Sequence, residues 1–428
     1  MIKKILIISY YWPPSGGSGV QRWLKFAKYL PKYNWYPIIY TPQNPYIELK
    51  DIDLEKDVSD RLDVVKTTIW EPYAFRDKLF GKSRRSQASG IISTKKTFKN
   101  RLLNWIRGNF FIPDPRIFWV KPSIRTLLKK IKGEGIEYLV TTGPPHSMHL
   151  IGLGIKKAIP NLKWVADFRD PWSKLDSLEE FQLSNYSRNK HKKLEKEVLK
   201  TADIVLTVSE NWQKEFKNLG ANRVELITNG YDTDDFKIKS ISTDKFIVGH
   251  YGLLNHLRNP DKLWEVLNAL CDKNTDFNNK LEIHLSGNIS KDVIVKIKSY
   301  DHLKDKVKQL GYLSHQQVLE EYNKVSILLL LLFNSNSGLG NYPGKMFEYF
   351  AAQKPILAFG PKGSDVEKLF RKLNTGTYYS YEDSVLESNI MNVFNNHNIS
   401  SVIKDKQLEG FSRENLTYDL SNLLNTLS

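Results

Sequence analysis

The chain has 428 residues, 41% of them hydrophobic, which is enough for two domains that each bury a core. Its formal net charge is +16, and the whole excess lies in residues 1–240, where 42 Lys and Arg stand against 26 Asp and Glu. The single cysteine, Cys271, excludes an intrachain disulfide framework and fits a reducing cytoplasm, and we expect it to be a small buried hydrophobe.

The first half of the chain alternates short apolar segments with segments of helical periodicity. Buried strands are predicted at 5–9, 37–41, 138–142, 164–167 and 204–208. Helices are predicted at 20–30, 123–131, 149–157 and 188–199. Strands separated by helices imply a parallel sheet that is covered on both faces.

The same alternation restarts after Asp244. Strands are predicted at 246–250, 281–286, 307–310, 327–332 and 356–359, and helices at 260–270, 315–323, from Pro343 onward and over 415–427. The longest apolar run, Val325 to Phe333, has nine residues and is too short for a membrane span. The first apolar segment lacks a secretory cleavage site, so we expect a cytoplasmic protein.

The helix that begins near Pro343 carries the most informative pattern. Pro343 suits the first turn of a helix, and a helix N-terminus directs unpaired N–H groups and partial positive charge at what lies before it. Lys345 adds a full charge there, and Glu348 follows one turn later on the same face. This arrangement suits a diphosphate and the two hydroxyls of a ribose, although Lys–Glu pairs at this spacing are also common on solvated surfaces.

A glycine loop follows the first predicted strand and precedes a helix. Gly16, Gly17 and Gly19 permit close approach of the backbone to a ligand, and the helix start favours an anion. A dinucleotide-binding fold would need a third glycine near Arg22 and an acid at the end of the second strand, and neither is present. NAD is therefore excluded, while a tight turn that serves packing alone stays an alternative.

Two further loops follow predicted strands, at the edge where α/β sheets bind ligands. Asp167-Phe168-Arg169-Asp170 places two carboxylates beside an arginine, and Asp170 is the candidate for contact with an acceptor hydroxyl and its proton. In the loop 142–147, His146 can hydrogen-bond to a sugar. The alternatives are an internal Asp–Arg pair and a histidine that only braces its loop.

These motifs resemble those of GT-B glycosyltransferases. The run from Asn341 to Tyr349, followed by Ala-Ala-x-x-Pro, resembles the donor-site helix of the retaining GT4 family, which includes sucrose synthases and bacterial polysaccharide mannosyl- and glucosyltransferases. Asp-Phe-Arg-Asp-Pro-Trp and Gly-Pro-Pro-His-Ser resemble segments of the cell-surface polysaccharide enzymes. The resemblance implies an α/β protein of two facing Rossmann-like domains (GT-B), with a C-terminal helix that returns to pack on the N-terminal domain.

The implied activity is transfer of a hexose from a nucleotide-diphosphate sugar to a lipid-linked or polysaccharide acceptor, with retention and without a metal. The domains expected are 1–228, for the acceptor, and 244–410, for the nucleotide sugar, followed by the helix of 411–428. The sequence departs from the family twice, because Leu253 replaces an arginine and Gly340 replaces the first of two glutamates. Arg258 is the candidate to replace a later family lysine. We expect backbone amides of 339–341, or another residue, to replace the lost glutamate in contacting the donor sugar.

The candidate residues form three sets. Those for the nucleotide sugar are Gly17, Gly19, Gly252, Arg258, Gly287, Asn341, Lys345 and Glu348. Those for the acceptor are Gly16, His146, Asp167, Arg169 and Asp170. The catalytic candidates are Asp170, Arg258 and Lys345. We expect no metal and no cofactor, because no His, Asp or Cys cluster suggests a metal centre and the nucleotide sugar is a substrate.

Residues 76–107 contain ten Lys or Arg and one acid, with Phe98, Leu102 and Trp105 or Ile106 on one helical face. This composition suits an interfacial helix on the anionic inner face of a membrane. No nucleic-acid recognition module accompanies it, and an exposed polar loop with one packed helix is the alternative. Trp119, further on, is expected to line the acceptor pocket.

Two other functions stay open. A non-catalytic GT-B subunit of a polysaccharide assembly complex would explain the two departures from the family. A nucleotide-sugar epimerase or hydrolase would consume the donor without any acceptor.

Overall fold

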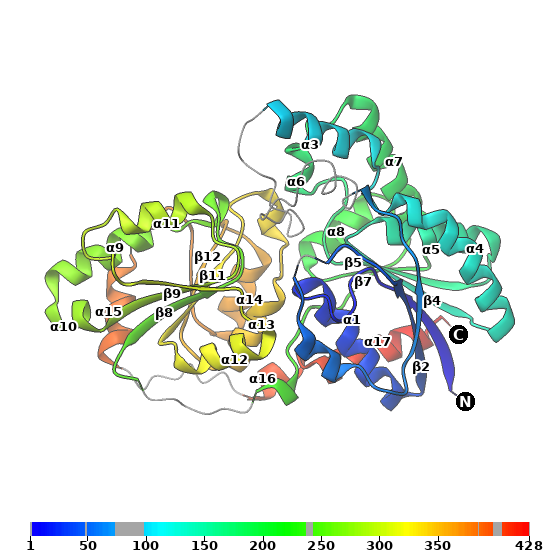
Figure 1. The fold of residues 1–428 in the computed structure, drawn as a ribbon. Helices are drawn as coiled ribbons and strands as arrows, with labels where there is room; N and C mark the ends of the chain where they lie inside the picture. The colour runs from blue at the N-terminus through cyan, green and yellow to red at the C-terminus, as the bar shows by residue number, and fades with distance from the viewer. Residues whose placement is uncertain are drawn as a thin grey trace. The chain divides into compact units, whose positions relative to one another are not determined.

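The computed structural model describes residues 2–47, 49–72, 98–236, 243–383, 385–396 and 405–427. The chain divides into two compact units (Figure 1), which we describe separately. The first unit consists of Met1–Thr228 and Leu416–Ser428, and the second of Asn229–Asn415. Of the basic segment 76–107, residues 76–97 lie outside the described residues.

The first unit contains a seven-stranded parallel sheet with the order β3-β2-β1-β4-β5-β6-β7. Its strands are β1 (Lys3–Ile8), β2 (Trp35–Pro42), β3 (Asp63–Thr67), β4 (Tyr138–Gly143), β5 (Lys163–Phe168), β6 (Ile204–Thr207) and β7 (Val224–Leu226). The five strands predicted in this half are confirmed. The two edge strands were not predicted, because β3 contains two charged residues and β7 has only three residues.

The helices of the first unit connect these strands. They are α1 (Ser18–Tyr29), α3 (Phe98–Phe110), α4 (Ile117–Glu134), α5 (Ser147–Ala158), α6 (Asp176–Glu179), α7 (Asn185–Thr201) and α8 (Glu210–Asn218). Serine side chains cap two of them: Ser184 accepts a hydrogen bond from the Ser187 amide at α7, and Ser209 accepts one from the Trp212 amide at α8. These caps satisfy amides that a helix N-terminus leaves unpaired.

The last helix, α17 (Arg413–Asn425), packs on the sheet of the first unit, as expected for the C-terminal helix (Figure 1). Leu416, Leu420 and Leu424 are buried in one cluster with Ile5 of β1 and Trp23 of α1. Their spacing places all three on one side of the helix. The end of the chain therefore contributes directly to the N-terminal core.

The second unit contains a six-stranded parallel sheet with the order β10-β9-β8-β11-β12-β13. Its strands are β8 (Phe246–Tyr251), β9 (Leu281–Ser286), β10 (Val307–Gly311), β11 (Ile327–Leu331), β12 (Ile356–Phe359) and β13 (Thr377–Tyr379). The first five are confirmed, and the three-residue edge strand β13 was not predicted.

Helices cover both faces of this second sheet. They are α9 (Asp261–Lys273), α10 (Thr275–Lys280), α11 (Lys291–Lys298), α12 (His315–Lys324), α13 (Gly344–Ala351), α14 (Asp365–Leu373), α15 (Glu387–Asn395) and α16 (Asp405–Glu409). Alternate residues of β11 belong to different cores: Leu329 packs with α9, α11 and α15, whereas Leu330 packs with α12, α13 and α14. Cys271 of α9 is buried in the first of these cores, as expected.

Leu420→Ala should destabilise the first unit by about 2–5 kcal/mol, because it removes a fully buried side chain from a packed core. Urea-induced unfolding followed by tryptophan fluorescence measures this, since nine of the ten tryptophans lie in residues 1–228. Asn422→Ala, at an exposed position of the same helix, is the matched control. Equal stability of the two variants would contradict the packing of α17.

Candidate functional site

Lys345 lies in the first turn of α13, beside the end of β8. Its ammonium donates a 3.1 Å hydrogen bond to the carbonyl oxygen of Tyr251. Pro343, expected inside the first turn, is the N-cap residue just before it, and its side chain makes no capping hydrogen bond. The N-terminus of α13 therefore presents backbone N–H groups beside a lysine, an arrangement that favours an anion.

The surroundings of Lys345 disfavour the charged form of its side chain. Burial lowers the pKa of Lys345 to about 7, the Arg258 guanidinium lowers it as well, and Glu348 acts in the opposite direction. No ion pair of Lys345 occurs among the described residues. A partly buried amine with a cation nearby and no paired carboxylate is stabilised in its charged form when an anion binds.

Arg258 closes the short 3-10 turn His256–Arg258, which follows β8. Asn255 caps this turn by accepting a hydrogen bond from the Leu257 amide. The Arg258 guanidinium stacks on the ring of Phe333, 3.7 Å from its centroid. The structure thus brings the predicted Arg258 near Lys345, and the aromatic ring fixes its plane.

Gly252 and Gly287 follow β8 and β9 and lie against each other. A Cβ atom on Gly287 would approach the Gly252 carbonyl oxygen to 2.5 Å, and Gly287 has φ +101°. A Cβ atom on Gly252 would approach the Lys345 ammonium to 3.1 Å. Side chains at these positions would therefore crowd Lys345, and glycines leave the strand ends accessible to a ligand.

Glu348 is held by two residues that the sequence did not single out. Its Oε1 lies 3.2 Å from Nε2 of His315, and its Oε2 accepts a 3.1 Å hydrogen bond from the Tyr322 hydroxyl. Burial acts to raise the pKa of Glu348, but His315 and Tyr322 outweigh it, so the pKa is lowered. His315 and Tyr322 lie seven residues apart on α12, a spacing that puts both on one helix face.

Asn341 and its neighbours precede α13. Asn341 is partly exposed between the short 3-10 turn Asn336–Leu339 and Pro343. The next residue, Tyr342, is held at both ends, because its carbonyl oxygen accepts from the Asn229 side chain and its hydroxyl donates to the Asp365 carbonyl oxygen. Its fixed position limits the conformations that Asn341 can adopt.

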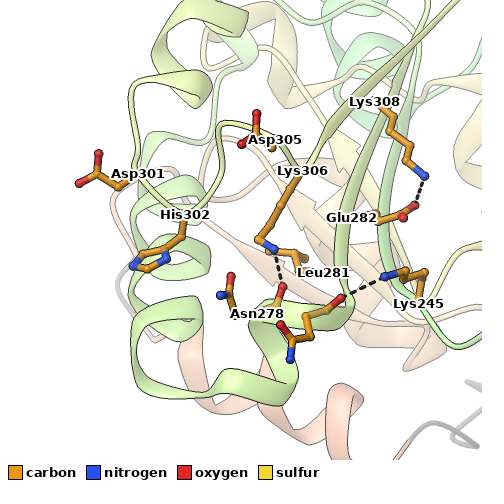
Figure 2. A pocket seen from close by; sticks show the side chains of 10 residues that line it. Lys245, Asn278, Leu281, Glu282, Asp301, His302, Asp305, Lys306 and Lys308 are labelled. Carbon is orange, nitrogen blue, oxygen red and sulfur yellow. Dashed lines mark hydrogen bonds and ion pairs between the residues drawn. The ribbon is translucent and has the colours of Figure 1, made fainter.

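A separate pocket of the second unit lies away from these residues. It has a volume of about 360 Å³ and is lined by residues at the amino ends of β8, β9 and β10 (Figure 2). Figure 2 shows that its lysines are already paired: Lys308 with Glu282 at 2.6 Å, Lys245 with the Asn279 carbonyl oxygen, and Lys306 with the Asn278 carbonyl oxygen. Ligand sites of such sheets form at the carboxyl ends instead.

In the first unit, Arg169 connects three loops at the carboxyl ends of the strands. Its guanidinium donates to the carbonyl oxygens of Gly143 at 3.3 Å, Pro144 at 2.6 Å and Gly19 at 3.3 Å. These bonds join the predicted acceptor loops to the glycine loop. Asp170, the next residue, is partly exposed beside Arg169.

Asp167 is fully buried and makes an ion pair with Arg22 of α1, at 3.1 Å. Trp23 and Thr142 also donate to it, at 2.7 and 2.9 Å. Burial acts to raise the pKa of Asp167, but the Arg22 guanidinium and the Trp23 hydrogen bond outweigh it, so the pKa is lowered and the group is a carboxylate. This geometry matches the alternative of an internal Asp–Arg pair, in which the arginine is Arg22. Asp170 is therefore better placed than Asp167 to contact an acceptor.

His146 is buried, and its ring stacks on Trp172 with the centroids 5.1 Å apart. Among the residues that the structure describes, neither ring nitrogen has a hydrogen-bond partner. Burial lowers the pKa of His146 well below its usual value, and the neighbouring His149 adds to this effect. His146 is therefore a neutral imidazole that packs against its neighbours. This fits the alternative in which the histidine only braces its loop.

The glycine loop has packing constraints of its own. Gly17 is the N-cap of α1 with φ +91°, and Gly16 donates a 2.8 Å hydrogen bond to the Leu49 carbonyl oxygen. A Cβ atom on Gly19 would approach the Tyr11 ring to 2.8 Å.

The prediction for Trp119 is wrong, because this residue is buried and stacked on Tyr40 in the core.

A scan against protein-family models and a search of curated proteins found no match. Solved structures match along nearly the whole chain. Sucrose-phosphate synthase from Thermosynechococcus elongatus has a TM-score of 0.66 at 13% identity and covers 99% of both chains. A complex of S. aureus TarM with fondaparinux, alpha-GlcNAc-glycerol and UDP has a TM-score of 0.61 at 14% identity, over 99% of this chain and 100% of that chain.

A third match is the lipopolysaccharide outer core galactosyltransferase WaaB, with a TM-score of 0.54 at 13% identity over 99% of both chains. Identities this low establish a common fold only. With two parallel sheets, helices on the faces of each and a returning terminal helix, the chain has the GT-B fold.

Above neutral pH, the protein should take up a proton when it binds a nucleotide. Because the pKa of Lys345 is about 7, most of the free amine is neutral at higher pH, and a bound diphosphate raises this pKa by stabilising the ammonium. Calorimetry at about pH 8.5, in buffers of different ionisation enthalpy, should show uptake approaching one proton per bound nucleotide. Lys345→Arg, which stays charged, should bind without this uptake; equal uptake by both proteins would contradict the assignment.

Tyr322→Phe should weaken nucleotide binding about 3- to 10-fold, because Glu348 loses one of the hydrogen bonds that orient it. If Glu348 contacts the ribose, the variant should also discriminate less between a nucleoside diphosphate and its 2′-deoxy form. Tyr349→Phe is the matched control, since that hydroxyl donates to the Leu329 carbonyl oxygen instead. Unchanged discrimination in Tyr322→Phe would show that Tyr322 does not position Glu348 for the ribose.

Proposed function

We propose that the chain is a hexosyltransferase that uses a nucleotide-diphosphate sugar and a lipid-linked or polysaccharide acceptor in bacterial cell-surface polysaccharide synthesis. The observation that carries this proposal is the partly buried Lys345 ammonium at the N-terminus of α13, with Arg258 beside it. In the transfer, the bond between the anomeric carbon and the diphosphate oxygen breaks, and negative charge develops on the diphosphate. Fixed cations and helix amides at that point stabilise the transition state.

Each remaining group has a part in this proposal. Glu348 accepts hydrogen bonds from the ribose, and Gly252, Gly287 and Asn341 let the backbone approach the donor. Asp170 accepts a hydrogen bond from the acceptor hydroxyl, whose oxygen forms the new bond to the sugar and whose proton passes to the Asp170 carboxylate. Retention of configuration and assignment to the GT4 family rest on the motif resemblance.

Two solved structures of this fold support a nucleotide-sugar donor. The TarM complex contains UDP, and an E. coli trehalose-6-phosphate protein (TM-score 0.56, 10% identity) is bound with UDP-2-fluoro glucose. We extend the donor class, but not the sugar, to this chain. Because Lys345, Arg258 and the helix amides supply the positive charge, we also propose that transfer needs no metal and persists in excess EDTA.

An epimerase or hydrolase is the second candidate. The same fold occurs in a putative UDP-N-acetylglucosamine 2-epimerase from Listeria monocytogenes, with a TM-score of 0.55 at 9% identity. The two functions differ in one requirement, because a transferase releases its nucleoside diphosphate only in the presence of an acceptor. Release without an acceptor would favour the epimerase or hydrolase.

Lys345→Ala should lower acceptor-dependent release of nucleoside diphosphate by roughly 10²-fold or more, the usual effect of losing one preorganised charge-stabilising group. Lys354→Ala is the matched control, because Lys354 is also partly buried and also donates to a backbone carbonyl oxygen, that of Asn323. Turnover of Lys345→Ala at the level of the control would contradict the role of Lys345.

A further inference from the structure

Five apolar side chains of the first unit form one exposed surface, which we call the aromatic surface. Trp70 follows β3, Leu102, Trp105 and Phe110 belong to α3, and Phe118 belongs to α4; they are 39–68% exposed. They include every tryptophan and phenylalanine that is exposed in the part of the chain that the structure describes. Apolar surface concentrated in this way marks an interaction site.

Ring contacts connect four of these five side chains in two groups. Trp70 meets Phe118 at 4.7 Å, Phe118 meets Phe111 at 5.9 Å, and Trp105 meets Phe110 at 5.7 Å between centroids. Phe110 and Phe111 are consecutive in the chain, so the two groups meet where α3 leads towards α4. The exposed apolar side chains therefore come from three segments that lie near one another.

The outward face of α4 continues this row with positive charge. Phe118 is followed on the same side of the helix by four exposed basic residues, at spacings of three or four: Lys121, Arg125, Lys129 and Lys132. We call these four the cationic face. The other side of α4 is apolar and buried, with Leu127 and Ile131 in the protein interior.

Two acidic residues that lie close in sequence to the aromatic side chains, Glu71 and Asp114, are paired within the protein. Glu71 is buried and pairs with Arg116 at 3.1 Å. Asp114 accepts hydrogen bonds from the amide and hydroxyl of Ser147. Across residues 76–133 the sequence has sixteen Lys or Arg and only two acids, so this segment accounts for most of the chain's excess charge.

We infer that the aromatic surface and the cationic face of α4 together bind an anionic lipid bilayer. Tryptophan and phenylalanine insert at the boundary between headgroups and acyl chains, while lysine and arginine pair with anionic headgroups. A soluble polyanion would use the cations but would leave the exposed apolar rings in water. The combination therefore favours a membrane over nucleic acid or a charged polysaccharide.

This surface differs from the predicted one, because it uses Trp70 and α4, which lie outside 76–107. It is also independent of glycosyl transfer, since a chain without transferase activity can still bind lipid through it. No helix of the described residues is long and apolar enough to cross a membrane. The contact proposed here is a peripheral one.

Vesicle sedimentation of the full chain tests the cationic face. Lys121→Glu/Arg125→Glu/Lys129→Glu should raise the lipid concentration for half-maximal binding at least about tenfold, on vesicles of phosphatidylcholine with phosphatidylglycerol, because each basic residue near an anionic surface adds about 1 kcal/mol. Lys192→Glu/Lys193→Glu/Lys196→Glu makes the same charge change at exposed positions of α7 and should bind like wild type. Thermal unfolding checks that both variants are folded.

Quenching by brominated lipid tests the aromatic surface in the wild-type protein. Eight of the ten tryptophans are buried, and only Trp70 and Trp105 are exposed. Anionic vesicles with bromine in the upper acyl chain should therefore quench part of the fluorescence. Trp70→Phe/Trp105→Phe should still bind the vesicles and should lose this quenching.

Four outcomes would overturn the inference. One is equal binding to neutral and anionic vesicles, and another is binding without any quenching by brominated lipid. The third is loss of binding only when Arg84, Arg85, Lys95 and Lys96 are reversed, with no effect of the α4 variant, because that result would assign the membrane contact to the segment before α3. Binding of soluble polyphosphate in place of vesicles would likewise assign the cations to a polymeric partner.

Discussion

The Lys345 ammonium occupies a position where burial, a neighbouring guanidinium and a helix N-terminus all act on a single charge. Its hydrogen bond to the Tyr251 carbonyl oxygen joins α13 to the end of β8. The touching glycines Gly252 and Gly287 leave room beside it. An anion relieves the repulsion from Arg258 and accepts from the helix amides, so the free site favours an anion. The rest of the second unit positions these few groups.

The first unit meets a different constraint, because its strand-end loops must be rigid although they contain little regular structure. The buried Arg22–Asp167 pair fixes α1 to β5, and breaking such a pair on one side is strongly destabilising. Arg169 then uses its guanidinium to join the glycine loop to the loops after β4 and β5. Several residues that looked functional thus support the loops, and Asp170 is the acidic residue that is still partly exposed there.

Local patterns were sufficient to predict the central strands, since β1, β4, β8 and β11 are apolar on both faces and need no tertiary information. The edge strands β3, β7 and β13 were missed because half-exposed or three-residue strands have no such pattern. Lys345 and Glu348 were singled out by the helix pattern together with the family resemblance, whereas His315 and Tyr322 were not, since they reach Glu348 from another helix. Asp167 was assigned to the acceptor because its partner Arg22 is 145 residues away in the chain.

The central claim is that the second unit binds the diphosphate and ribose of a nucleotide sugar through Lys345 and Glu348. Calorimetric titration of the wild-type chain and Glu348→Ala with UDP, GDP, dTDP and CMP tests it most directly. The account predicts that one nucleoside diphosphate binds the wild type and that Glu348→Ala binds it much more weakly. Absence of binding by every nucleotide, or equal binding by both proteins, would contradict the account.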